Sequence, residues 1–393
     1  MIAIILSPIY IFLNIYIVRW LLEWTVACSG LFENFIVKCI VIGIYTFFAS
    51  SFVAGFFLPF RFLKLIGNYW LGIIQHILTV VLMADFTRLI LVRTHLISSL
   101  FLSSKVVFIV TGIICMLLIL SISIYGIIHA KKIIYSNYNI KLNKRVVGLS
   151  KMKIALVSDL HLGYNSTPSH IKKMVRMIND GNPDLVIIDG DIFDNDYKAI
   201  KDPDKIINIL KAIKSKYGVF AVYGNHDIDE AILAGFTFSS KNKVRLSDPK
   251  MAEFLDKANI RLIRDDSLLI KDSFYLVGRL DYRKYGVDVK ERKNIKELLV
   301  DVDKNKPIIV MDHQPCELEE LAKNGVDIDL SGHTHKGQML PTGIFGKLVW
   351  KNNYGILKIN SMYSIVTSGI GVYGPNMRIG STAEVALINI DFA

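Results

Sequence analysis

The sequence predicts two unlike parts: a transmembrane region of about four helices over residues 1–130, and a layered αββα sandwich over residues 153–393, joined by a linker over 131–152. The first observation is that charged residues are sparse up to about residue 125 and concentrated after it. The second is that short apolar strands alternate with helices from residue 153 onward, a pattern typical of layered α/β domains.

Four uncharged runs predict the spanning helices: residues 1–18, 39–60, 65–84 and 106–130. Each is close to the ~20 residues that a helix needs to cross the hydrocarbon core, and only helices satisfy their own backbone there. The alternative, buried helices of a large soluble core, is disfavoured because the runs lack amphipathic faces. The first run has no basic start and no cleavage site, so we expect a retained span rather than a signal peptide.

The distribution of Lys and Arg predicts a multi-pass cell-membrane protein with its C-terminal domain on the cytoplasmic face. The side carrying both termini would hold Arg61, Lys64, Lys131, Lys132, Lys141, Lys144 and Arg145, and the opposite side Arg19, Lys38, Arg88, Arg93 and Lys105. Asp85 and Arg88, three residues apart on one predicted helix, are expected to form a structural ion pair.

The net charge of +11 does not predict a nucleic-acid partner, because Lys and Arg are scattered among acids. Attraction of residues 131–145 to anionic headgroups is the simpler interpretation, which makes membrane lipids the expected partners. Only Cys316 lies in the C-terminal half, so that half offers neither an internal disulfide nor a cysteine zinc site.

The C-terminal half divides into predicted elements by periodicity and by helix start and stop signals. The strands are expected at 153–158, 185–188, 219–223, 268–270, 273–278, 307–311, 328–331, 364–368 and 384–391, and the helices at 168–180, 204–217, 249–258, 288–300 and 317–324. The linker is a further candidate for a first strand.

Metal-ligand residue types follow several of these strands, where open α/β sheets place their ligands. The loops contain Asp159 and His161; Asp189, Asp191 and Asp194; Asn225, His226 and Asp227; Asp312 and His313; and His333 and His335. Taken singly, each could be an ordinary turn or surface pair. Together they predict two divalent metal ions, and imidazole with carboxylate favours Mn, Fe or Zn over Mg or Ca.

Spacing suggests how the ligands divide. Asp159 and His161, two residues apart after a strand, can chelate one ion. A single carboxylate at Asp191 could bridge two ions, since Gly190 lets the backbone approach closely. Asn225 offers a neutral oxygen, and His333 and His335 can give one imidazole to each ion.

The series DxH, GDxxD, GNHD, H and GHTH resembles the calcineurin-like metallophosphoesterase superfamily over about residues 153–390. It is similar to a bacterial membrane-attached branch with a GHTHGGQ loop, which also has a Gly-rich segment and an Arg near its end, as at 368–371 and Arg378. The resemblance implies that Asp159, His161 and His335 hold the first metal, that Asp191 bridges, and that Asn225, His313 and His333 hold the second. It also implies that His226 lies beside the metals without binding them and is oriented by Asp227.

These roles agree with known phosphoester chemistry. Two metals ~3.5–4 Å apart clamp a phosphoryl group and activate a water. The hydroxide attacks phosphorus in line, and His226 protonates the leaving alkoxide as general acid, with Asp227 keeping the imidazole charged and turned.

The substrate is less well defined. Monoesters, diesters and pyrophosphates remain open, and a lipid-linked substrate is attractive beside a membrane. The strings SDLHLG, GDIFD and GNHD also resemble hydrolases of UDP-2,3-diacylglucosamine. Lys336, which replaces a Gly in GHTHKGQ, faces solvent or contacts a phosphate oxygen, and Arg378 is a second candidate substrate contact. Loops at 231–245 and 278–289 are expected around the pocket.

Two other functions fit the sequence less well. A non-catalytic membrane receptor would be expected to lack a ligand or His226, and all are present. A transporter would need polar residues through its spans, and they are sparse.

Overall fold

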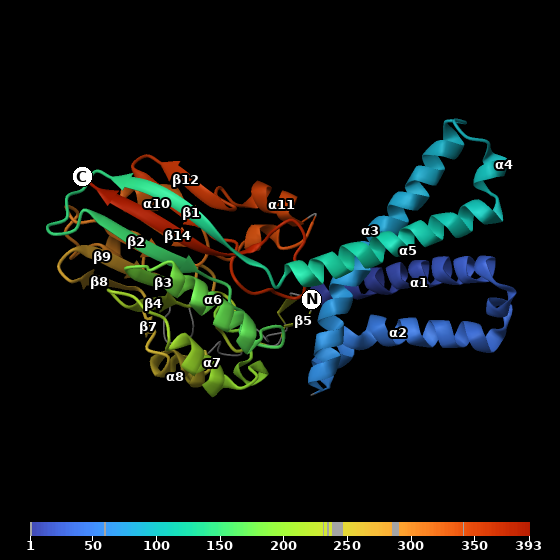
Figure 1. The fold of residues 1–393 in the computed structure, drawn as a ribbon, viewed down its shortest axis with the longest axis horizontal. Helices are drawn as coiled ribbons and strands as arrows, with labels where there is room; N and C mark the ends of the chain where they lie inside the picture. The colour runs from blue at the N-terminus through green and yellow to red at the C-terminus, as the bar shows by residue number, and fades with distance from the viewer. Residues whose placement is uncertain are drawn as a thin grey trace. The chain divides into compact units, whose positions relative to one another are not determined.

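The computed structural model describes residues 2–58, 60–230, 232–233, 236–237, 247–284, 291–340 and 342–393, which fall into two compact units. The first contains Met1–Ile128, Ile232–Phe238 and Gly374–Met377; the second contains His129–Ala231, Ser239–Tyr373 and Arg378–Ala393. Figure 1 shows the first as long helices and the second as an α/β body.

The first unit has four helices long and apolar enough to cross a membrane: α1 (Ile2–Cys28), α2 (Phe35–Phe57), α3 (Arg61–Arg93) and α5 (Lys105–His129). Short helices η1 (Gly30–Glu33) and α4 (Ser99–Leu102) join them. Each long helix contains most or all of one predicted run, so the four apolar runs are confirmed as helices.

Polar side chains join these helices at a few points. The Tyr10 hydroxyl donates to the Ala49 carbonyl at 2.7 Å and accepts from Trp70 Nε1 at 3.0 Å. The expected ion pair between Asp85 and Arg88 is not formed among the described residues; instead, Asp85 Oδ2 accepts a hydrogen bond from the Tyr16 hydroxyl at 2.5 Å. The spacing of Asp85 and Arg88 along α3 could not reveal that Tyr16 of α1 would be the partner of Asp85.

The second unit is built on two six-stranded sheets, in the orders β1-β14-β2-β3-β4-β7 and β12-β13-β11-β10-β9-β8. The first contains β1 (Ile133–Leu142), β2 (Lys151–Val157), β3 (Leu185–Asp189), β4 (Val219–Val222), β7 (Arg261–Leu262) and β14 (Ala383–Phe392). The second contains β8 (Asp266–Ile270), β9 (Phe274–Gly278), β10 (Ile308–Met311), β11 (Ile328–Ser331), β12 (Gly355–Ile359) and β13 (Met362–Val366). The strands β5 (Ile232–Leu233) and β6 (Phe236–Thr237) form a separate hairpin.

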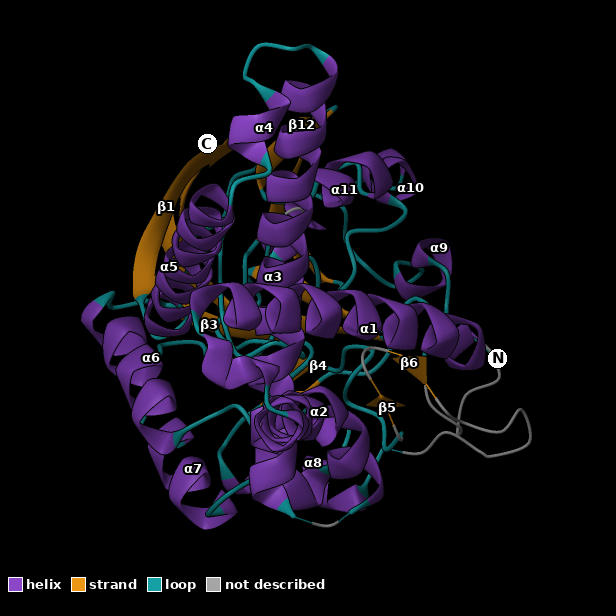
Figure 2. Cartoon of the chain, turned by 90° about the vertical axis from the view of Figure 1, so that its right-hand side faces the viewer, coloured by secondary structure: helices purple, strands orange, loops and turns teal. Residues whose placement is uncertain are grey.

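Helices cover the outer faces of both sheets, so the predicted αββα sandwich is confirmed. Figure 2 shows α6 (Pro168–Asp180), α7 (Pro203–Leu210) and α8 (Pro249–Lys257) on one side, and α9 (Ile295–Leu298), α10 (Leu318–Lys323) and α11 (Thr342–Val349) on the other.

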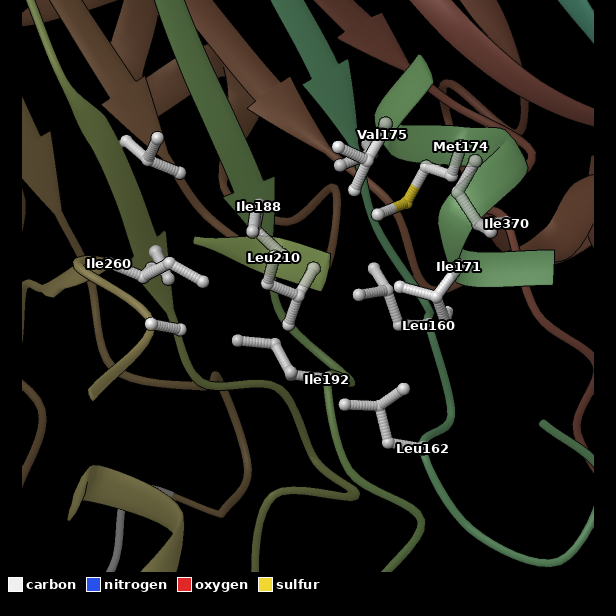
Figure 3. Close-up of a cluster of buried hydrophobic side chains, with 14 of the residues drawn as sticks. Leu160, Leu162, Ile171, Met174, Val175, Ile188, Ile192, Leu210, Ile260 and Ile370 are labelled. Atoms are coloured by element: carbon white, nitrogen blue, oxygen red, sulfur yellow. The ribbon is translucent and has the colours of Figure 1, made fainter. Parts of the chain in front are cut away.

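Alternation along the strands produces separate hydrophobic layers. In β2, Ala155 and Val157 pack with α6–α8, whereas Ile154 and Leu156 pack between the two sheets. Figure 3 shows the outer layer, where Met174 of α6 lies among residues such as Leu160 and Ile188. Successive side chains on a strand point to opposite faces, so one apolar run serves both layers.

The structure confirms the first strand for which the linker was a candidate. Within 131–152, β1 pairs in parallel with β14 along its whole length, from Ile133 opposite Ala383 to Leu142 opposite Phe392. Its exposed positions alternate with half-buried or buried ones, and β1 lies at the edge of its sheet. Its partner β14 lies at the far end of the sequence, so the composition of residues 131–152 alone could not show the pairing.

Other boundaries shifted as well. The helix predicted at 204–217 ends at Leu210 in α7, and within the described part of the predicted helix 288–300 only α9 is helical. The sequence did not predict β12 or α11.

Candidate metal centre

Loops at the carboxyl ends of strands from both sheets carry the predicted site residues. In the first sheet, β2 is followed by Asp159 and His161, β3 by Asp191, and β4 by Asn225, His226 and Asp227; in the second sheet, β10 is followed by His313, and β11 by His333 and His335. The neighbours β2, β3 and β4 are parallel, as are β10 and β11, so each set of loops leaves its sheet at one edge.

The loops form two groups of possible metal ligands. Asp159, His161 and His335 make one, Asp191, His313 and His333 make the other, and within each group the ligand atoms lie within 4.8 Å of one another. His335 Nε2 is 3.3 Å from Asp159 Oδ1, and His313 Nε2 is 3.0 Å from Asp191 Oδ2. The groups are adjacent, since His313 Nε2 is also 4.0 Å from Asp159 Oδ1.

Several buried atoms in these groups fit a metal ion. Among the described side chains, Asp159 Oδ1, Asn225 Oδ1 and His313 Nε2 are buried and have no hydrogen-bond partner. Buried polar atoms are normally satisfied, and each of these can offer a lone pair. The Nδ1 atom of His313 lies 2.7 Å from the Asp189 carbonyl oxygen and so donates to it, which leaves Nε2 free to bind.

The backbone at the site is held in unusual conformations. Positive φ angles occur at Asp159, His161, Asp191, His333 and His335, in the range 43° to 67°. Such conformations are uncommon outside glycine and cluster at functional sites, where the surrounding structure must hold them. Here the loops hold each other: the amides of Asp159 and His161 donate to the carbonyls of Gly190 and Asp191, each at 3.0 Å.

Gly190 permits a close approach between the two sheets. Its φ is +75°, and a Cβ atom there would lie 2.5 Å from His313 Nδ1. No side chain other than hydrogen fits without moving this ligand, which supports the close backbone approach expected before Asp191.

The orientation of His226 differs from the expectation. Its Nδ1 atom forms a short hydrogen bond with Asn195 Oδ1, and Asn195 Nδ2 donates to the Ile228 carbonyl at 3.0 Å. An amide oxygen only accepts, so Nδ1 carries the proton and Nε2 is the free position. The residue that orients His226 is therefore Asn195.

The predicted orienting role of Asp227 is wrong. The carboxylate of Asp227 instead accepts hydrogen bonds from the backbone amides of Phe193 and Gly224, each at 2.7 Å. It thus ties the loop after β3 to the loop after β4. The adjacent position of Asp227 in GNHD suggested a contact that the turn does not allow.

Burial controls the protonation of several groups at the centre. It lowers the pKa of His226 to about 4 and that of His333 to about 3, so both rings favour the neutral form. Burial also raises the pKa of the Asp227 carboxyl to about 7. A neutral imidazole at His333 suits metal binding, which requires the deprotonated ring.

Arg378 and Lys336, the two candidate substrate contacts, both make contacts within the protein. Arg378 is fully buried, and its Nη2 donates to the carbonyls of Ser368, Gly369 and Gly371 at 2.6–3.2 Å. Its guanidinium has no exposed surface for a substrate and holds the Gly-rich loop instead. Lys336 is exposed, with Nζ 4.0 Å from the centre of the Tyr354 ring.

Two charged residues of the loop expected at 278–289 are buried. Arg279 and Asp281 are 2% and 1% exposed. Arg279 Nη1 donates to Asp312 Oδ2 at 2.8 Å, directly before His313. Most of the loop at 231–245, and residues 285–289 of the second loop, lie outside the described residues.

Sequence reasoning missed Asn195, Tyr373 and Trp350. The Tyr373 ring lies 4.3 Å from that of His226, and its backbone amide donates to Gln338 Oε1 at 2.9 Å. The Trp350 ring lies 5.3 Å from that of His333. The final Gln of GHTHKGQ was the available signal for the Tyr373 contact; nothing local indicated the other two.

Known proteins resemble this chain mainly over the α/β unit. Residues 152–337 match the family model described as Calcineurin-like phosphoesterase. A Danio rerio "Transmembrane protein with metallophosphoesterase domain" is 28% identical over 280 residues, which are 68% of this chain and 60% of that protein. An uncharacterized metallophosphoesterase of Aquifex aeolicus is 29% identical over 262 residues, 64% of this chain and 90% of that protein.

A third relative carries a specific substrate in its name. The UDP-2,3-diacylglucosamine pyrophosphatase LpxG of Chlamydia trachomatis is 23% identical over 251 residues, covering 56% of this chain and 74% of LpxG. The alignment with the Danio rerio protein, described above, covers less than two thirds of that protein's length.

Proposed function

Because residues 152–337 form a calcineurin-like phosphoesterase domain, we propose that this chain is a membrane-anchored hydrolase that uses two divalent metal ions to cleave a phosphate ester or pyrophosphate. The observation that carries the proposal is the pair of adjacent ligand groups, each with buried carboxylate and imidazole atoms within 4.8 Å. Mn, Fe and Zn all suit this mixture of ligands.

The residues divide between the metals as the family resemblance implied. Asp159, His161 and His335 would hold one ion, and Asn225, His313 and His333 the other. Asp191 would bridge, since its Oδ2 lies 3.0 Å from His313 Nε2 of one group and its negative charge also acts on the His161 ring of the other group, where it raises the pKa. When bound, the ions would lower the pKa of a water and offset the phosphoryl charge.

His226 would transfer a proton to the leaving oxygen through Nε2. The bond to Asn195 fixes the proton of the neutral ring on Nδ1, so Nε2 is the atom left to exchange a proton with the substrate. Because burial lowers the pKa of His226 to about 4, the ring is neutral at neutral pH. An anionic phosphate beside the ring would raise this pKa and so favour the imidazolium that acts as general acid.

A lipid-linked phosphate is the favoured substrate class, with UDP-2,3-diacylglucosamine as the specific candidate. The four apolar helices and the similarity to LpxG support it. We propose the cytoplasmic face for the domain, from the Lys and Arg distribution. A non-catalytic receptor with the same fold is the alternative.

The test is hydrolysis by the full-length chain in lipid nanodiscs, loaded separately with manganese, iron and zinc. The full-length chain is used because a soluble fragment beginning at Tyr138 would lack the first half of β1. The substrates are p-nitrophenyl phosphate, bis-p-nitrophenyl phosphate and UDP-2,3-diacylglucosamine. We expect metal-dependent turnover that Asp191→Ala abolishes and that Asp256→Ala, on the exposed face of α8, preserves. Two bound ions without turnover of any substrate would instead favour the receptor.

A further inference from the structure

Helix α11 presents an unusually apolar surface to solvent. Ile344, Phe345, Leu348 and Val349 are 60%, 60%, 81% and 73% exposed. Single exposed apolar residues are ordinary, but several on one short helix mark a surface that contacts another apolar phase or partner.

Lysines surround this surface. A groove of about 560 Å³ beside α11 is lined by apolar residues, including Leu340 and Ile356, and by Lys336, Lys347 and Lys351. Lys351 is paired with Glu319, whereas Lys336 rests over the Tyr354 ring. An apolar face bordered by lysines is the pattern of helices that lie in the interface of an anionic membrane.

The groove lies next to the metal centre. Lys336 directly follows His335, and Trp350, which also lines the groove, has its ring 5.3 Å from that of His333. Whatever covers α11 is therefore close to the ligands of both metal groups.

Strand topology places the start of β1 at the metal-binding edge of the sandwich. Strand β1 is parallel to β14, which is antiparallel to β2. The amino end of β1 therefore lies at the edge where β2, β3 and β4 end and the metal-binding loops begin. Only three residues separate His129, the last of α5, from Ile133, and an extended chain covers that step in about 14 Å.

The same edge includes the groove beside α11. The Tyr354 hydroxyl donates to Glu384 Oε2 at 2.9 Å, and Glu384 also accepts from Ser136 near the amino end of β1. Figure 1 shows α11 and the start of β1 at the same end of the α/β body.

We propose that α11 inserts its apolar face into the interface of an anionic bilayer, with Lys336 and Lys347 at the headgroups, and so holds the metal centre at the membrane surface. The occupant is lipid rather than a protein partner, because the chain enters the sandwich at this edge directly after a helix apolar enough to span a membrane, and the lysines beside α11 complement anionic headgroups. The inference rests on the proposed membrane anchoring and not on hydrolysis.

A fluorescent probe can report where α11 lies. In a full-length chain whose four cysteines are replaced by serine, Leu348→Cys and Val147→Cys would each be labelled with the environment-sensitive dye NBD. Val147 is a matched control: it is 95% exposed and lies in the β1–β2 loop, at the opposite edge of the sheet. The nanodiscs contain phosphatidylcholine and phosphatidylglycerol, with doxyl-labelled phosphatidylcholine as quencher.

We expect a blue-shifted emission at position 348 and several-fold stronger lipid quenching there than at position 147. Lys347→Glu should reduce the quenching in these nanodiscs. Equal quenching at the two positions would overturn the proposal, and so would a blue shift without lipid quenching, which would indicate a protein contact. Failure of the chain to elute with nanodiscs would instead refute the membrane anchoring, and hydrolysis assayed on the same samples tests the catalytic proposal separately.

Discussion

The two sheets of the sandwich supply different chemistry to one centre. Loops of the first sheet provide both candidate carboxylate ligands, Asp159 and Asp191, together with the amide of Asn225 and His226, the proposed proton donor. Loops of the second provide imidazoles only: His313, His333 and His335. Each ligand group takes members from both sheets, so neither sheet alone holds a complete set, and the centre exists only when the layer between them is packed.

The second sheet has a further support for its loops. Backbone hydrogen bonds join the loops within each sheet, as between the amide of Asp159 and the carbonyl of Gly190 and between the amide of Gly332 and the carbonyl of His313. The second sheet also places buried charge behind its ligands: Arg279 and Arg292 both donate to Asp312, which precedes His313. Its loops therefore also depend on ion pairs removed from water.

The largest expected effect is the loss of the bridging carboxylate of Asp191, compared with the loss of a single imidazole at His333. We expect Asp191→Ala to lose both metals and to reduce hydrolysis to background, because this residue would serve both ions. His333→Ala should retain the ion of the other group. Metal analysis of the purified variants alongside hydrolysis measures the difference, and equal metal loss in both variants would contradict the bridging role.

The next effect concerns proton transfer from the first sheet. His226→Ala should lower kcat by about 10²–10⁴-fold while both metals remain bound. Asn195→Ala should lower it by a smaller factor than His226→Ala and change the pH dependence, because the ring loses the partner that fixes its tautomer. Asn195→Asp should retain more activity than Asn195→Ala, since it preserves an acceptor at Nδ1. If Asn195→Ala leaves the pH profile unchanged, Asn195 has only a structural role.

The buried ion pair between Arg279 and Asp312 behind the second sheet should contribute to the free energy of unfolding. Removing Arg279 leaves Asp312, which is fully buried, short of one partner, and breaking a buried pair costs about 3–5 kcal/mol. Arg279→Met is expected to lower the free energy of unfolding by that order in chemical denaturation. Lys257→Ala, which breaks the exposed pair with Glu253, should leave it unchanged. A similar small effect for both would refute the buried network.

A pH-dependent effect is expected from Asp329 of β11. Burial raises the pKa of this carboxyl from 3.8 to about 8. The folded state therefore binds a proton that the unfolded state releases above about pH 4, and this contribution to stability is lost as the pH rises through about 8. When the pH is raised from about 5 to about 9, the free energy of unfolding of Asp329→Asn should fall less than that of the native chain, as measured by denaturant titrations. Equal falls in the two proteins would contradict the raised pKa.

The smallest expected effect is at Lys336. Because its ammonium rests over the Tyr354 ring at an exposed position, Lys336→Ala should change KM for a small soluble substrate such as bis-p-nitrophenyl phosphate by no more than about fivefold. A much larger change would return Lys336 to the role of a phosphate contact.

By itself, the sequence determined the elements whose signals are local. The apolar runs that became α1, α2, α3 and α5, the strands β2, β3, β10 and β11, and the metal-ligand types after them were all predicted, and the αββα fold followed. A strand buried on both faces and a ligand residue in the loop after it are neighbours in the chain, so periodicity and motif spacing are sufficient to find them.

The tertiary structure alone decided which groups touch. His226 bonds Asn195 rather than the adjacent Asp227, Arg378 holds carbonyls of the Gly-rich loop rather than facing substrate, and residues 133–142 pair as β1 with a strand at the far end of the chain. The apolar groove beside α11 likewise joins segments with no shared local pattern. Hydrogen-bond partners and surfaces of this kind depend on which distant segments pack together, and that is fixed only when the two sheets close on their common core.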